Sequence, residues 1–369
     1  MLEGLLAGLG FGRRYTEKMR AAWSQDIKAE GEHVRHEIAR ELKHMRIEQE
    51  KLMRAEQEKW ARALSAVQDS LAQAIERQHK AERRATQFIL QHELDEKNHD
   101  LVERLPSLLD ESRVSAHVRQ AIETARLLDD PFPHTVVEDV MPADVYKTML
   151  RAIPPADFFG DKDLTKQNLR IPVDRGPALT TRVWQFVDDI ARRAIVPAVL
   201  SRFEAPLHRH YEALFGDAAA RAATLAQSPS GGRVMLRRPG YHLSPHRDPK
   251  RAMLTCLMYL TARGDGEAHG TKIFRVTGDH ESSYTQTYYP EQNGATCELV
   301  KTVPFRPNSM LVFLNGTGAH GADIPMDAPA DLERFSYQFY VGPSVGSLDA
   351  LVAELPEERQ KLWKGKGES

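Results

Sequence analysis

The 369-residue sequence has only two cysteines, Cys256 and Cys297, and no proline before Pro106. Two thiols are too few for a disulfide framework, so a reducing cytoplasmic location is expected. No run of 18 apolar residues is present, which argues against a membrane-spanning helix. Neither sign of charge dominates, since 50 Lys and Arg stand against 52 Asp and Glu. Without an overall positive field, neither nucleic acid nor a membrane surface is an expected partner.

The first twelve residues, MLEGLLAGLGFG, are apolar and superficially resemble an export signal. They lack the basic segment and the small-residue cleavage site that a signal peptide carries. We therefore expect a hydrophobic helix tip or docking tail here.

Residues 32–105 contain neither glycine nor proline and are rich in strong helix formers. One unbroken helix of this length would extend about 110 Å, too long to pack inside a small domain. Its apolar residues mostly follow the 4-3 steps of a coiled coil, with polar interruptions and one stutter. The seam comprises Ile38, Leu42, Met45, Leu52, Trp60, Leu64, Val67, Leu71, Ala74, Ala81, Ala85 and Phe88. Two interpretations remain open: a homo-oligomer formed through this helix, or a hairpin that folds back on its own chain.

Three parts follow from this pattern: a helical, coiled-coil region over residues 1–130, a part with both helices and strands over 131–345, and a terminal helix with a polar tail over 346–369. In the part over 131–345, a short β run at 134–140 precedes a helix that opens at Pro142, and a long helical stretch follows, interrupted by Pro197 and Pro206. From Gly232 onward, short apolar runs alternate with turn residues: RVMLRR, AMLTCLMYLT, TKIFRV, CELVKTVPF, SMLVFLN and RFSYQFYV. This pattern predicts an α+β domain with an antiparallel double sheet or barrel.

Candidate metal ligands lie in this strand-rich part. His246 and Asp248 are two residues apart, so on an extended segment both side chains point the same way. A third ligand must come from elsewhere, and His320 is the leading candidate. Two imidazoles and one carboxylate form the facial triad that leaves coordination positions open on Fe(II). Taken singly, each histidine is more often structural; His242 and His269 are nearby substitutes, although His242 suits a cavity rim better.

The segment 245–274, PHRDPKRAMLTCLMYLTARGDGEAHGTKIF, resembles the iron- and 2-oxoglutarate-dependent dioxygenases of the prolyl-hydroxylase-like branch. The order of elements is similar as well: HxD, a strand ending in Tyr-Leu, the turn Gly270-Thr271, a strand shortly before His320, and a last strand opening with Arg334. The resemblance covers residues 131–345 and implies a double-stranded β-helix, or jelly roll, with flanking helices. It does not cover the long N-terminal helix.

The resemblance implies that His246, Asp248 and His320 bind iron, and that Arg334 holds the distal carboxylate of 2-oxoglutarate with a hydroxyl from Tyr259. A buried carboxylate requires a charged or hydrogen-bonding partner, and a guanidinium group can bind it through two parallel hydrogen bonds. With Fe(II), 2-oxoglutarate and O2, the implied reaction is hydroxylation of a C–H bond with release of succinate and CO2. Asp248 favours hydroxylation, since halogenating relatives carry a small residue there. The 14-residue interval from His320 to Arg334 is longer than is common in the family.

The substrate class is left as a small molecule or a peptide. The rim segments 158–175 and 278–297 carry polar groups and the aromatic residues Tyr284, Tyr288 and Tyr289. Either Arg237 or Arg238 is a candidate to place a guanidinium in the cavity. Two other functions stay open: a non-catalytic coiled-coil scaffold with a degenerate barrel, and a cupin-like metal protein that does not use 2-oxoglutarate. A carboxylate clamp at Arg334 and Tyr259 argues against both.

Overall fold

The computed structural model describes residues 13–160, 163–262, 266–279 and 286–363. The chain divides into two compact units, residues 1–82 and 83–369, and each is considered by itself. The apolar first twelve residues, for which a helix tip or docking tail is predicted, lie outside the described residues. Among the described helices, none is both long and apolar enough to cross a membrane.

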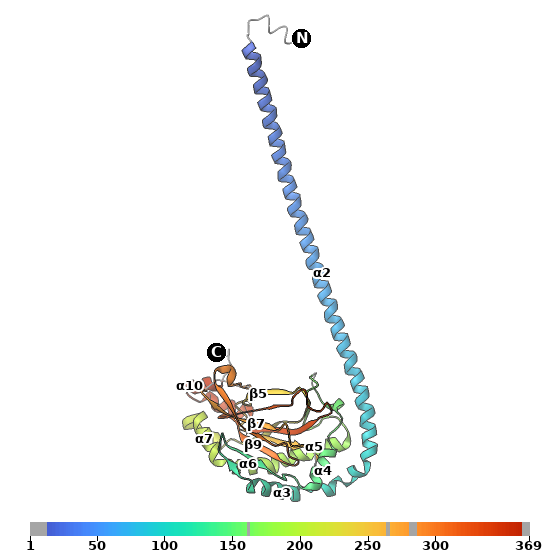
Figure 1. The fold of residues 1–369 in the computed structure, drawn as a ribbon, viewed down its shortest axis with the longest axis vertical. Coiled ribbons are helices and arrows are strands. Elements are labelled where there is room, and N and C mark those ends of the chain that lie inside the picture. The colour runs from blue at the N-terminus through green and yellow to red at the C-terminus, as the bar shows by residue number, and fades with distance from the viewer. Residues whose placement is uncertain (1–12, 161–162, 263–265, 280–285, 364–369) are drawn as a thin grey trace. The chain divides into compact units, whose positions relative to one another are not determined.

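The long N-terminal helix is present and is longer than the sequence predicts. Helix α2 (Arg13–Leu108) runs for 96 residues without a reversal, so the hairpin interpretation is wrong (Figure 1). It passes through Gly31, which costs about 1 kcal/mol relative to alanine in a helix. Pro106 lies in its last turn, where it cannot donate a hydrogen bond to the carbonyl of Val102, and the helix ends two residues later.

Within α2, the side chains of the apolar seam are exposed. Every side chain from residue 17 to residue 86 is exposed. Large apolar side chains of the seam are among them, including Trp60 at 72% and Leu64 at 61% exposure. Homo-oligomerisation through this helix stays a prediction.

Short helices form a layer on one face of the larger sheet. They are α3 (Glu111–Thr124), α4 (Ala143–Arg151), α5 (Ala178–Ile190), α6 (Val196–Arg202), α7 (Glu204–Phe215) and α8 (Ala219–Ala223). Figure 1 shows α3, α4, α5 and α6 along one side of the strands. The predicted helix at Pro142 is confirmed as α4, and the predicted long helical stretch is divided near Pro197 and Pro206 into α5, a π-helical turn, α6 and α7.

Eleven strands in the described residues form two antiparallel sheets. The seven-stranded sheet has the order β1 (Leu127–Leu128), β2 (His134–Val137), β9 (Met310–Leu314), β6 (Leu254–Leu260), β11 (Arg334–Pro343), β4 (Gln227–Arg237) and β3 (Lys166–Arg170). The four-stranded sheet has the order β5 (His242–His246), β10 (Ala319–Asp323), β7 (Thr271–Thr277) and β8 (Thr296–Val303). Apart from the β7–β8 hairpin, consecutive strands from β4 to β11 alternate between the two sheets. The predicted α+β class and the six predicted strands are confirmed.

Alternation along β11 separates the core from the cavity. Tyr337 and Phe339 face the helices, and the Tyr337 ring lies 5.5 Å from that of Trp184 on α5. Ser336 and Gln338, on the other face, line a cavity instead. This is the period of two that a strand imposes on its side chains.

The C-terminal segment forms two short helices, α9 (Val345–Ala353) and α10 (Glu357–Gln360), where one was predicted. The break occurs at Pro356, which lies just before the first residue of α10. The Trp363 ring stacks on Phe215 at 5.1 Å, and the Lys250 ammonium donates to the carbonyl of Leu362 at 2.6 Å. These contacts attach the segment to the rest of the second unit.

Candidate metal centre

His246, Asp248 and His320 converge, as the spacing predicts. His246 is the last residue of β5 and pairs directly with His320 of β10, so the two imidazole rings lie 4.1 Å apart between centroids. Asp248 follows two residues after His246. Its oxygens lie 3.9 Å from His246 Nε2 and 3.6 Å from His320 Nε2. One donor atom from each residue lies within 4.8 Å of the others, and all three side chains are buried.

Both histidines are held in the neutral form that binds metal. His246 Nδ1 donates to the carbonyl of Ser244 at 3.0 Å, which leaves the Nε2 lone pair directed at the cluster. Burial lowers the pKa of His246. Burial and the neighbouring His246 lower the pKa of His320 to about 3. At neutral pH, two neutral imidazoles therefore lie beside one carboxylate.

Two hydroxyl groups fix the Asp248 carboxylate. Thr255 Oγ1 donates to one oxygen at 2.7 Å, and the Tyr340 hydroxyl donates to the other at 3.1 Å. Thr255 and Tyr340 are directly paired across β6 and β11, so one cross-strand pair binds both oxygens. Asn315 holds the backbone, because its amide accepts from the Asp248 N–H at 3.1 Å and donates to the Asp248 carbonyl at 2.8 Å.

The donor set fits a divalent metal ion. Burying a carboxylate costs free energy unless a positive charge lies beside it. The two hydroxyl donors bind the Asp248 carboxylate but do not neutralise its negative charge. Two neutral imidazoles and one carboxylate, together with outer hydrogen bonds that orient them, match the 2-His-1-carboxylate site of non-haem iron. Thr255, Tyr340 and Asn315 carried no signal in the sequence, since their role depends on strand register.

The two residues predicted to bind 2-oxoglutarate line the same cavity as the metal cluster. This cavity has a volume of about 700 Å³, and Tyr259 and Arg334 both contribute to its wall. The Tyr259 hydroxyl donates to Thr271 Oγ1 at 2.8 Å, and its ring stacks on Phe305 at 4.4 Å. The Arg334 guanidinium lies 5.1 Å above the Phe305 ring and donates to the carbonyl of Gly266 at 2.8 Å. The side chains of Tyr259, Thr271, Phe305 and Arg334 therefore form one wall of the cavity. Binding of the distal carboxylate of 2-oxoglutarate by Arg334 and Tyr259 stays a prediction.

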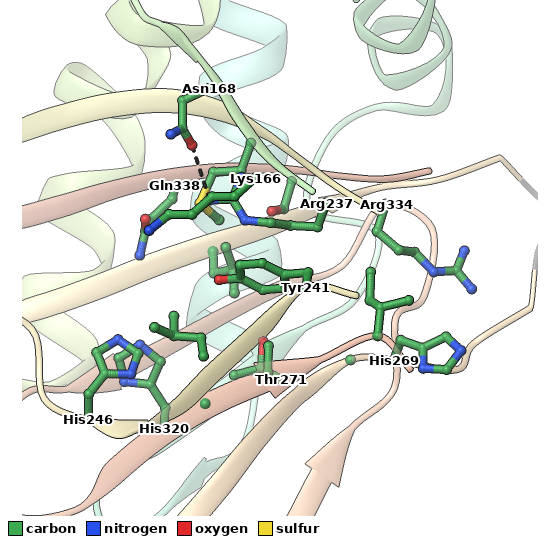
Figure 2. Close-up of a pocket in the computed structure, with 18 of the residues that line it drawn as sticks. Lys166, Asn168, Arg237, Tyr241, His246, His269, Thr271, His320, Arg334 and Gln338 are labelled. Atoms are coloured by element: carbon green, nitrogen blue, oxygen red, sulfur yellow. Dashed lines mark hydrogen bonds between the residues drawn. The ribbon is translucent and has the colours of Figure 1, made fainter. Parts of the chain in front are cut away.

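Figure 2 shows the labelled side chains of the cavity. Arg334 and His269 lie toward one end of the view, and His246 and His320 toward the other. His269 lines the cavity with a left-handed backbone, φ 62°. His242 is exposed, bonds to Ser244 and is absent from the lining, so it substitutes for neither ligand.

Arg237, the last residue of β4, lines the cavity, and Arg238, which follows the strand, does not. Arg238 instead pairs with Glu333 at 2.6 Å. The long interval before Arg334 leaves that residue at the start of β11, directly opposite Arg237. The expanded loop therefore does not displace Arg334 from the cavity.

The predicted rim segments contribute in part. From 158–175, Asp163, Lys166 and Asn168 line the cavity, and from 278–297 Thr287 and Tyr289 do so. The Tyr288 hydroxyl bonds to Asp279 at 2.9 Å instead. Tyr284 lies outside the described residues.

No protein-family model matches the chain, and no curated protein matches its sequence. Solved structures that are similar include a prolyl-4-hydroxylase of Pseudomonas putida, with 16% identity over 62% of this chain and 98% of that chain, and a TM-score of 0.34. HygX of Streptomyces hygroscopicus, with nickel and 2-oxoglutarate bound, has 12% identity over 57% and 83% of the two chains and a TM-score of 0.35. AviO1 of Streptomyces viridochromogenes has 11% identity over 64% and 96%, with a TM-score of 0.36. At these values, the assignment of function rests on the residues of the site.

Proposed function

We propose that this chain is an Fe(II)- and 2-oxoglutarate-dependent oxygenase that hydroxylates a C–H bond of a small molecule or peptide. The observation that carries the proposal is the buried His246, Asp248 and His320 cluster, which opens into a cavity that also holds Arg334. The sequence resemblance over 131–345 supports it, as does the alternation of strands between two sheets, which is the connectivity of a jelly roll.

The iron and 2-oxoglutarate, once bound, supply the oxidising chemistry: one atom of O2 enters the substrate as a hydroxyl group, the other enters succinate, and CO2 is released. The residues of the chain position the reactants. Thr255 and Tyr340 hold the Asp248 carboxylate in one orientation, and Ser244 fixes the tautomer of His246. The Tyr259 and Arg334 wall provides a hydroxyl group and a guanidinium for the distal carboxylate.

The N-terminal unit has a separate proposed role. Its exposed apolar seam supports a homo-oligomer formed through α2, because a long single helix gains stability by burying such side chains against another helix.

The test is O2-dependent conversion of 2-oxoglutarate to succinate with added iron. We expect the wild-type chain to form succinate slowly without substrate, and His320→Ala to abolish that turnover because one ligand is gone. His242→Ala is the matched control, since His242 is exposed and lies outside the cavity lining. Arg334→Gln should raise the 2-oxoglutarate requirement about 100-fold, as expected for charge-assisted hydrogen bonds, and Arg334→Lys should recover part of it.

Metal binding without any response to 2-oxoglutarate would favour the cupin-like alternative. Absence of metal binding in the folded chain would favour the scaffold.

A further inference from the structure

Arg247 is a buried arginine that lies between two of the proposed metal ligands. His246 and Asp248 line the cavity and Arg247 does not, as expected when successive side chains of an extended segment point to opposite faces. Arg247 donates from Nε to the carbonyl of Gly318 at 2.9 Å and from Nη2 to that of Thr317 at 3.4 Å. These two residues directly precede β10, the strand of the third ligand. One side chain therefore joins the two segments that supply all three ligands.

The bend to which Arg247 bonds is closely packed on its other side. A Cβ on Gly318 would lie 1.8 Å from Cδ1 of Phe132, so the backbone here is in contact with the Phe132 ring. That ring lies 6.0 Å from the ring of Phe313, and the Phe313 ring lies 4.6 Å from the imidazole of His320. The Arg247 guanidinium is therefore attached to a tightly packed part of the fold.

An acidic and an aromatic residue complete the surroundings of the Arg247 guanidinium. Asp279 accepts from Arg247 Nη1 at 2.5 Å, and its other oxygen accepts from the Tyr288 hydroxyl at 2.9 Å. The centre of the Tyr288 ring lies 5.6 Å from the guanidinium carbon. Asp279 balances the positive charge of Arg247, which would otherwise oppose the binding of a cation nearby.

Thr287, Tyr288 and Tyr289 form a wall segment of the cavity. Arg247 and Tyr288 are paired in an antiparallel bridge, in which each N–H donates to the carbonyl of the other residue, at 2.8 and 3.0 Å. Thr287 and Tyr289 line the cavity and Tyr288 does not, so side chains alternate here as well. The centroid of the Tyr289 ring lies 5.9 Å from that of the His246 ring. The wall segment therefore lies beside a metal ligand.

We propose that Arg247 is a positioning residue that couples the metal ligands to the wall segment. A bound metal restrains the backbone on both sides of Arg247, and the restraint reaches the wall segment through the backbone bridge, the Asp279 pair and the Tyr288 ring. By reciprocity, an ordered wall segment strengthens metal binding by the same factor. The inference rests on the proposed function, in which the wall segment faces the substrate. Its consequence is that this side of the substrate site is completed only when the metal is bound.

The test is hydrogen exchange of the full chain with and without zinc, a redox-inert substitute for iron, followed by mass spectrometry on peptides that contain the wall segment. We expect zinc to slow exchange of the wall-segment amides about tenfold in the wild type, a factor typical of coupled sites. The Tyr288 N–H is among them, since it donates to the Arg247 carbonyl.

The variant combines Arg247→Met with Asp279→Leu. It removes both charges of the pair, so no buried charge is left unpaired and the fold should persist. In this double variant, zinc should slow exchange of the wall-segment amides less than about threefold, and zinc affinity, measured by competition with a chelator, should fall about tenfold.

Arg275→Met is the matched control. Arg275 lies on β7 of the same sheet, pairs with Asp130 at 2.7 Å and does not line the cavity. This variant should keep the zinc-dependent slowing and the zinc affinity of the wild type. Equal slowing in the double variant and the wild type would overturn the coupling, because a merely structural role of the pair would change exchange equally with and without zinc.

Tyr288→Phe serves if the double variant does not fold, since it removes only the hydroxyl group that bonds to Asp279. The slowing by zinc should then be reduced about threefold, and slowing equal to that of the wild type would overturn the inference. Failure of zinc to bind the wild type would contradict the proposed function together with the coupling. Zinc binding that leaves exchange of the wall segment unchanged would contradict the coupling alone.

Discussion

The hydroxyl group of Tyr340 is predicted to control metal affinity without binding the metal. It donates to Asp248 at 3.1 Å and accepts from Arg233 Nη2 at 3.0 Å. Burial, followed by the charge of Asp248, raises the pKa of Tyr340 to about 12, so the group remains a protonated donor at any working pH. Tyr340→Phe removes this donor and retains the ring.

The expected loss follows from the charge of the acceptor. A hydrogen bond to a charged group contributes about 1.5–3 kcal/mol. At about 1.4 kcal/mol for each factor of ten, metal affinity should fall by roughly 10- to 100-fold, the range typical of outer-sphere partners. Thr255 still bonds the other carboxylate oxygen, and Arg233 still bonds Gln338, so the fold should persist.

Tyr337→Phe is the matched control on the same strand. The Tyr337 hydroxyl is buried on the opposite face of β11, with no hydrogen-bond partner among the described residues. Its removal should leave metal affinity unchanged, and stability equal or slightly higher, because an unsatisfied buried group is lost. The assay is competition for Mn(II) or Fe(II) against a chelator of known affinity, with thermal unfolding of each variant. Wild-type affinity in Tyr340→Phe would refute the role of this hydroxyl.

Three further predictions concern stability and assembly. Burial lowers the pKa of His210 to about 4 from the ordinary value of 6.5. As the pH falls below 6.5, this histidine therefore becomes protonated in the unfolded chain and stays neutral in the folded chain. The free energy of unfolding should decrease by about 2 kcal/mol by pH 5. His210→Gln should remove this part of the pH slope in urea unfolding, and an unchanged slope would count against it. A Cβ on Gly270 would lie 1.7 Å from the carbonyl oxygen of Val303, so Gly270→Ala should destabilise the fold by about 1–3 kcal/mol. A Cβ on Gly31 would meet nothing within 4 Å, so Gly31→Ala is the control and should not destabilise the fold. Introducing Leu64→Glu together with Leu71→Glu into the full chain should reduce the particle mass measured by light scattering to that of one chain. Gln73→Glu is the control and should leave that mass unchanged. An unchanged mass in the double variant would show that the seam is not the association surface.

Local patterns were sufficient to predict the elements and the three clustered residues. Alternation on an extended segment placed His246 and Asp248 on one side, and proline positions marked where α5, α6 and α7 divide. The hairpin interpretation was wrong because a hairpin requires a turn, and residues 32–105 contain neither glycine nor proline to form one. The helix α2 also continues through Gly31 without a break.

Contacts that depend on the pairing of distant strands were not predictable. The pairing of Thr255 with Tyr340, which fixes Asp248, requires β6 to lie beside β11 in one particular register. The pairing of Arg334 with Arg237, and of Arg237 with Lys166, likewise joins β11, β4 and β3, although Lys166 and Arg334 are 168 positions apart. A single-residue change in register would turn these side chains to the opposite face.

Anaerobic titration of the chain with Fe(II) and 2-oxoglutarate tests the central claim most directly. A chelate of the two on His246, Asp248 and His320 should give a weak visible charge-transfer band that requires both components and disappears in Asp248→Ala. Iron binding with no such band on adding 2-oxoglutarate, or a band that persists in Asp248→Ala, would contradict the proposed oxygenase site.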